Sequence, residues 1–136
     1  MRFVDTNVLL YSVSTQPEEA RKSAVARAVL KSRDLVLSVQ VLQEFYVQFT
    51  RPSRRDPLSH DDALAFIETW KRFPIVDVTL GLFDEAMAVK VRHQLSYWDS
   101  AIVAAARIAG CDELLSEDMS AGQDYGGVKV ANPFAT

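Results

Sequence analysis

The sequence has few of the residues that build the commonest reactive sites. A single cysteine, Cys111, excludes an internal disulfide and a zinc site made of several cysteines. A lone cysteine fits a reducing cytoplasm, where we expect the protein to work. The two histidines, His60 and His93, fall away from the predicted strand ends, so nucleophile triads have no support. Glycine-rich phosphate-binding motifs of the GxxxxGK[ST] and GxGxxG types do not occur either.

Long apolar runs are lacking as well. No stretch approaches the roughly 20 apolar residues that cross a bilayer, and Asp5 and Asn7 interrupt any apolar core of an N-terminal signal. We therefore expect no membrane contact. The net charge of −3 argues against nucleic-acid binding by the whole surface, although a local basic groove stays open. The 136 residues, 49% hydrophobic and 24% charged, predict a single domain covering 1–136.

Short apolar segments alternate with helical patterns along the chain. The segment 35–38 is apolar up to its last residue, as is typical of a strand buried on both faces. The alternation predicts an α/β fold, a three-layer α/β/α domain with a central parallel sheet of four to five strands. We predict strands at 3–6, 35–38, 75–78, 113–116 and 128–130, and helices at about 17–31, 41–50, 60–73, 80–94 and 96–109.

Ligands of such a sheet bind beyond the carboxyl ends of its strands, and this rule selects a few of the 18 acidic residues. Asp5 ends the first predicted strand, and Glu117 and Asp118 follow the fourth. Asp5 could equally cap the next helix. Glu44 lies early in the helix 41–50, at the flank of its apolar stripe, where position alone favours a solvent-exposed residue.

Asp99 is the most informative acid. It lies in the first turn of a helix whose following residues are almost all small and apolar, so its carboxylate leads a buried face. Asp99 also follows Ser96 by three residues, as in a capping box, so a structural role in capping this helix is the alternative to metal binding. A buried carboxylate needs a partner, and a cation shared with Asp5 would supply one. Oxygen-only ligands suit Mg²⁺ or Mn²⁺, and several carboxylates around such a cation typically act on phosphodiesters.

Four segments together resemble the signature of PIN-domain nucleases, and the size resembles the stand-alone bacterial toxins of the VapC type. They match in order and spacing: FVDTNVLLY at 3–11, VQVLQEFY at 39–46, YWDSAI at 97–102 and LLSEDM at 114–119. The resemblance implies an endoribonuclease that uses Mg²⁺ or Mn²⁺ to cleave RNA. It also implies a homodimer and a small cognate antitoxin protein that blocks the site.

The same resemblance implies a role for each matching residue. Asp5 and Asp99 would bind the metal, Glu44 would hold the metal or its water, and Asp118 would complete the site or bind a second metal. The residues expected to orient these groups are Thr6, Asn7 and Ser116. The family's fourth motif is usually Thr-x-Asp, whereas the chain has Ser116-Glu117-Asp118, so either acid could face the metal.

Basic residues are densest in the segment after the helix 41–50. Arg51, Arg54 and Arg55, here called the loop arginines, are candidates for RNA contact, with Lys71 and Arg72 as a second group. A solvated loop is an equally open interpretation of this segment. Contacts to RNA phosphates would weaken as salt rises.

Two other functions compete with the nuclease, and the sequence argues against one of them. A degenerate PIN domain would bind RNA or a protein partner without cleaving. An enzyme that uses Asp5 as a covalent nucleophile is disfavoured, because phosphatases of the haloacid type need a second aspartate where Asn7 stands. Receiver domains need a lysine after a late strand, and the segment 114–117 has none.

Overall fold

A single parallel sheet forms the centre of the molecule. The computed structural model describes residues 1–135. Its five strands lie in the order β3-β2-β1-β4-β5, and every neighbouring pair is parallel. The strands are β1 (Arg2–Val4), β2 (Leu35–Ser38), β3 (Ile75–Val76), β4 (Glu113–Leu115) and β5 (Lys129–Ala131). β1 is therefore central, and the chain departs from it to β2 on one side and to β4 on the other.

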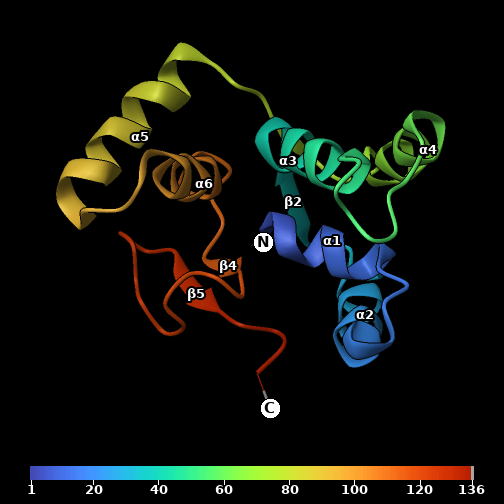
Figure 1. The fold of residues 1–136 in the computed structure, drawn as a ribbon. Coiled ribbons are helices and arrows are strands. Elements are labelled where there is room, and N and C mark those ends of the chain that lie inside the picture. Colours follow the sequence, from blue (N-terminus) through green and yellow to red (C-terminus); the bar gives the residue numbers. More distant parts are fainter. Residues whose placement is uncertain (136) are drawn as a thin grey trace.

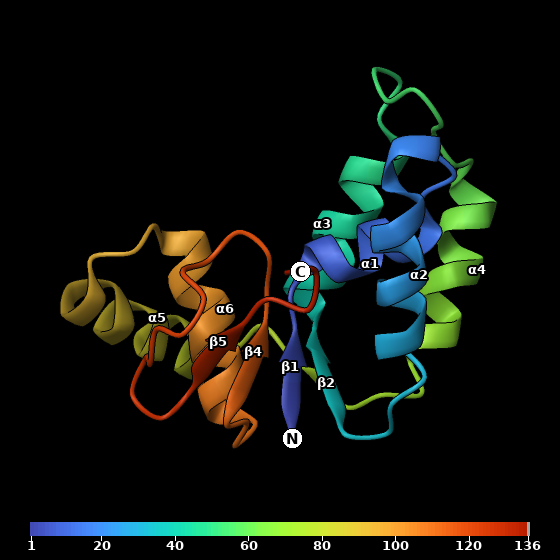
Figure 2. The same ribbon diagram turned by 90° about the horizontal axis from the view of Figure 1, so that it is seen from below.

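Helices cover both faces of the sheet. The helices are α1 (Thr6–Val13), α2 (Ala20–Val29), α3 (Val39–Thr50), α4 (His60–Trp70), α5 (Leu80–His93) and α6 (Tyr97–Ile108), and a short 3-10 turn, η1 (Pro17–Glu19), precedes α2. In Figures 1 and 2, α1 to α4 lie on one side of the strands, and α5 and α6 lie on the other. This arrangement confirms the predicted three-layer α/β/α fold.

The first strand is shorter than predicted. It ends at Val4, and Thr6 already begins α1, a helix that the prediction of a strand over 3–6 did not include. The cause is local: the Asp5 carboxylate accepts a hydrogen bond from the Thr6 backbone N–H at 2.7 Å and so caps the helix. The third strand is also shorter than 75–78, because it ends at Val76 and leaves Val78 exposed.

The core lies on both faces of β1. Phe3, Leu35 and Leu114, from three neighbouring strands, are fully buried. On one face, the small residues of α6 between Ala101 and Ala106 are buried and allow that helix to lie close to the sheet. On the other, Phe45 of α3 packs edge-on against Trp70 of α4, with ring centroids 4.7 Å apart.

None of the helices within the described residues is long and apolar enough to cross a bilayer.

Candidate active site

Asp5 lies at the carboxyl end of the central strand and is held at both carboxylate oxygens. Its backbone N–H continues the pairing of β1 with β4 by donating to the Leu115 carbonyl at 3.0 Å. Oδ1 accepts from the Thr6 N–H at 2.7 Å, and Oδ2 accepts from the Ser116 hydroxyl at 2.7 Å. The residue is only 8% exposed. Asp5 is thus a helix cap and also a buried carboxylate at the mouth of the sheet, so its two predicted roles are compatible.

The charge of Asp5 is disfavoured by its surroundings. Burial raises the pKa of its carboxyl from 3.8 to about 6, although the hydrogen bonds from Ser116 and Thr6 oppose this rise. The negative charges of Glu44 and Asp118 raise the same pKa further. Three of the predicted acids therefore lie close enough to interact electrostatically.

Glu44 is fixed rather than left to solvent. Its Oε2 accepts from the Thr6 hydroxyl at 2.7 Å, and its Oε1 accepts from the Gln40 side-chain amide at 2.7 Å. Gln40 also donates to the Trp98 carbonyl at 3.2 Å, which ties α3 to the start of α6. Gln40 is not among the site residues predicted from the sequence. Its position four residues before Glu44 on one helix is the signal that indicates this contact.

Asp99 lies in the first turn of α6, on the side of the sheet opposite to α3 and Glu44 (Figures 1 and 2). Ser96 caps this helix by accepting from the Asp99 backbone N–H at 3.1 Å, so half of the predicted capping box is present. Burial raises the pKa of the Asp99 carboxyl, Ser96 opposes the rise, and the charges of Asp118 and Glu44 add to it. Asp99 therefore shares the electrostatic field of the other acids.

The structure distinguishes between the two neighbouring acids after β4. Asp118 is exposed and accepts from the Asn7 amide at 3.2 Å, on the side of the candidate site. Glu117 instead forms an ion pair with Lys22 and accepts from the Tyr11 hydroxyl at 2.6 Å. Although burial raises it, the pKa of Glu117 is lowered overall by these two contacts.

One buried oxygen in the site has no partner. Within residues 1–135, the Asn7 Oδ1 is the buried side-chain atom left without a hydrogen bond. An unsatisfied oxygen among carboxylates is the chemistry that a hard divalent cation prefers, so the residue set fits Mg²⁺ or Mn²⁺. In the described chain, however, no three or more His, Cys, Asp or Glu side chains are arranged closely enough to hold a metal ion.

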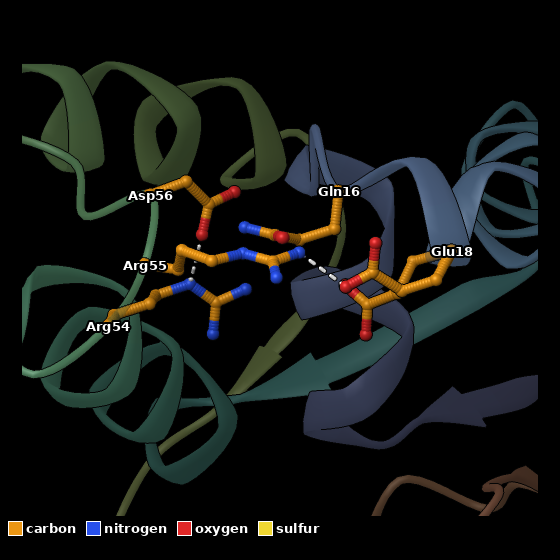
Figure 3. A pocket seen from close by; sticks show the side chains of 6 residues that line it. Gln16, Glu18, Arg54, Arg55 and Asp56 are labelled. Carbon is orange, nitrogen blue, oxygen red and sulfur yellow. Dashed lines mark hydrogen bonds and ion pairs between the residues drawn. The ribbon is translucent and has the colours of Figure 1, made fainter.

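The loop arginines lie around other cavities. Arg54 pairs with Asp56 at 3.0 Å and lies 3.8 Å from the centre of the Phe49 ring, and Arg55 pairs with Glu18. These two arginines line a cavity of about 340 Å³, none of whose lining residues is a predicted metal ligand. Their side chains are drawn in Figure 3. Arg51 is exposed. Two of the loop arginines are therefore neutralised by acids of the same chain, and their contact with RNA stays a prediction.

A comparison with known families identifies the family of the chain. A family model of the PIN domain matches residues 2–120. The chain belongs to the PIN domain family. This PIN domain has a close likeness in solved structures, whereas none of the curated proteins matches it in sequence.

Three solved structures illustrate the likeness. A toxin–antitoxin complex from Klebsiella pneumoniae contains a chain that is 17% identical, with a TM-score of 0.72 and 100% of both chains covered. VapC20 of Mycobacterium tuberculosis, a toxin that cleaves the sarcin–ricin loop, is 24% identical, with a TM-score of 0.66 over 87% of this chain and 92% of its own. FitAcB of Neisseria gonorrhoeae is 19% identical, with a TM-score of 0.63 and 100% of both chains covered. At these identities the likeness shows a shared fold.

Proposed function

We propose that this PIN domain is a metal-dependent endoribonuclease, the toxin of a toxin–antitoxin pair. The observation that carries the proposal is the environment of Asp5. Its buried carboxylate is faced by the charges of Glu44 and Asp118, and within residues 1–135 no ion pair joins it to a lysine, arginine or histidine. Such a cluster needs a cation from outside the chain.

Mg²⁺ or Mn²⁺ is the cation that this set of oxygens fits. Asp5, Asp99 and Asp118 would hold it, and Glu44 would hold the metal or its water. A cation bound by these residues would supply Lewis-acid chemistry for the activation of water and for the charge on the leaving oxygen of the phosphodiester.

The supporting residues give the acids unequal freedom. Ser116 and the Thr6 N–H hold both oxygens of Asp5, and Thr6 with Gln40 holds both oxygens of Glu44. Asp118, in contrast, has its hydrogen bond from Asn7 at the longer distance of 3.2 Å. We infer that Asp5 and Glu44 form the most firmly held part of the site and that Asp118, exposed and held by one hydrogen bond, is held less firmly.

Two of the similar structures suggest partners for this chain. One is a toxin–antitoxin complex, and the other, VapC20, is a toxin that cleaves the sarcin–ricin loop. By analogy we propose an RNA substrate, a cognate antitoxin protein, a homodimer and a cytoplasmic location.

The open arrangement of the acids favours one second candidate. Because no three of them are already gathered for a metal in the described chain, a PIN domain that binds RNA or a protein partner without cleaving is the alternative. A matched series of variants separates the two functions. Each is incubated with total RNA and Mg²⁺ after circular dichroism has shown that it is folded. The variants are Asp5→Asn, Glu44→Gln, Asp99→Asn and Asp118→Asn.

The control is Asp112→Asn, which removes an acid that is 83% exposed at the other end of β4. If the proposal holds, wild type and control cleave RNA, and the site variants lose about 100-fold or more of the rate. Folded wild-type protein that binds RNA and leaves it intact supports the binding module instead. Equal cleavage by all variants would assign the activity to other residues.

A further inference from the structure

A large aromatic side chain lies exposed beside the candidate site. Trp98 immediately precedes Asp99 at the start of α6 and is 65% exposed. The neighbouring Tyr97 packs edge-on against it, with ring centroids 4.9 Å apart and an interplanar angle of 77°. This contact supports the indole without covering it. Most of this large apolar surface is therefore left uncovered by the described chain.

Trp98 forms one wall of a cavity that opens next to Glu44. The cavity measures about 410 Å³, and its lining residues are Gln40, Gln43, Glu44 and Trp98. Gln40 links two of its walls, because its amide donates to Glu44 at 2.7 Å and to the Trp98 carbonyl at 3.2 Å. Gln43 is exposed. The cavity thus combines an exposed aromatic side chain with amide groups and shares a carboxylate with the candidate site.

We propose that this cavity, here called the Trp98 platform, binds a nucleobase of the RNA next to the bond that is cut. The inference rests on the proposed function, and it adds Trp98 as a residue that binds the substrate and Gln43 as a residue that selects it. The base stacks on the Trp98 indole, which tolerates any base because every base has an aromatic face. The Gln43 amide carries both a donor and an acceptor and contacts the polar edge of the base, which supplies preference among bases.

A second copy of the chain is the competing occupant of this surface. The central part of a protein–protein interface is depleted in charged residues. The Trp98 platform, in contrast, includes Glu44, one of the acids of the candidate site. A nucleobase suits this mixture better, since its face is apolar, its edge forms hydrogen bonds, and its phosphate reaches the site beside it.

The test compares RNA with and without bases. Binding is measured by fluorescence anisotropy with labelled single strands of about 12 nucleotides, a length within the range of roughly 4 to 16 nucleotides that one single-strand-binding fold covers. The strands are oligo(U), oligo(A) and an abasic strand of equal length. The protein carries Asp5→Asn to block cleavage. We expect Trp98→Ala to weaken binding of the strands with bases about 5-fold to 100-fold and to leave the abasic strand unchanged. Trp98→Phe should restore most of the affinity, because phenylalanine still stacks.

Two controls make the readout specific. Phe66→Ala removes another partly exposed aromatic residue, 38% exposed on α4, and should leave all three affinities unchanged. Tryptophan fluorescence gives an independent signal, because the other tryptophan, Trp70, is only 3% exposed. Oligo(U) should quench the tryptophan fluorescence of the Asp5→Asn protein. The fluorescence of the same protein with Trp98→Phe should not change.

Several outcomes overturn the Trp98 platform. One is equal weakening of binding to the abasic strand. Another is unchanged binding by Trp98→Ala while wild type cleaves RNA, which leaves the proposed nuclease intact. A third is a change from dimer to monomer in sedimentation of Trp98→Ala with unchanged RNA affinity, which assigns the surface to a second copy. Base-dependent loss of binding together with a wild type that never cleaves RNA keeps the platform and removes the nuclease.

Discussion

Replacing Asp5 by asparagine should make the metal-free protein more stable at neutral pH. Burial raises the pKa of this carboxyl from 3.8 to about 6, so ionisation is disfavoured in the folded state. The unfolded chain releases the proton near its ordinary pKa, whereas the folded protein retains it up to about pH 6. The free energy of unfolding therefore falls as pH rises between these two values and stays low above them. Asparagine carries no charge and escapes this loss.

The size of the effect follows from the pKa change. At about 1.36 kcal/mol per unit, the rise from 3.8 to about 6 corresponds to about 3 kcal/mol. Asparagine still accepts the hydrogen bond from the Thr6 N–H as a helix cap. The hydroxyl of Ser116, however, then faces an amide donor, and this costs about 1 kcal/mol. A net gain of about 2 kcal/mol is therefore expected at neutral pH, and a net loss of about 1 kcal/mol below the ordinary pKa, where only the cost at Ser116 is left.

Urea unfolding in EDTA, followed by circular dichroism below the ordinary pKa of aspartate and at neutral pH, measures both values. Asp112→Asn serves as the matched control and should change neither. Mg²⁺ should then stabilise wild type, by about 2.7 kcal/mol at about 100 times its Kd, and should stabilise Asp5→Asn much less. An Asp5→Asn protein that is less stable than wild type at neutral pH in EDTA would show that burial of this charge is not costly.

Three further perturbations test the groups around the acids. Thr6→Val removes the hydroxyl that holds Glu44 at 2.7 Å, so Mn²⁺ affinity measured by calorimetry should fall about fivefold, and an unchanged affinity would deny Thr6 this role. Lys22→Met removes the ion-pair partner of Glu117, the neighbour of Asp118. The cleavage rate should fall while the melting temperature changes little, and Lys22→Arg should recover the rate. An equal loss of rate in both variants would contradict a role for the ion pair. Replacing all loop arginines by glutamine should reduce the salt dependence of RNA binding, and an unchanged slope would remove them from the RNA contact.

Much of the fold could be predicted because the strands carry a strong local signal. The apolar segments at 3–4, 35–37 and 114–115 are buried in neighbouring strands, and the parallel order follows from the helices between them. The end of the first strand was harder. An apolar run such as that at 8–11 suits a strand or a buried helix equally, and only the cap at Asp5 decides for a helix.

The site was predictable in its positions but not in its contacts. Asp5 and Asp99 stand out because a carboxylate beside a buried segment needs a partner. Glu44 depended on the family resemblance, since its position favoured exposure. The separation of Glu117 from Asp118 depends on contacts to residues far away in the chain, Lys22 for the one and Asn7 for the other. Such contacts arise only when the sheet order brings α1 and α2 beside the end of β4.

Cleavage of total RNA by the purified wild-type protein, with Mg²⁺ or Mn²⁺ and again with EDTA, shows most directly whether the acids around Asp5 act together on RNA through a divalent cation. We expect fragments with either metal, none with EDTA, and a return of cleavage when excess metal is added back. Cleavage that continues unchanged in EDTA would rule out the divalent cation, and folded, metal-loaded protein that leaves RNA intact would rule out the nuclease.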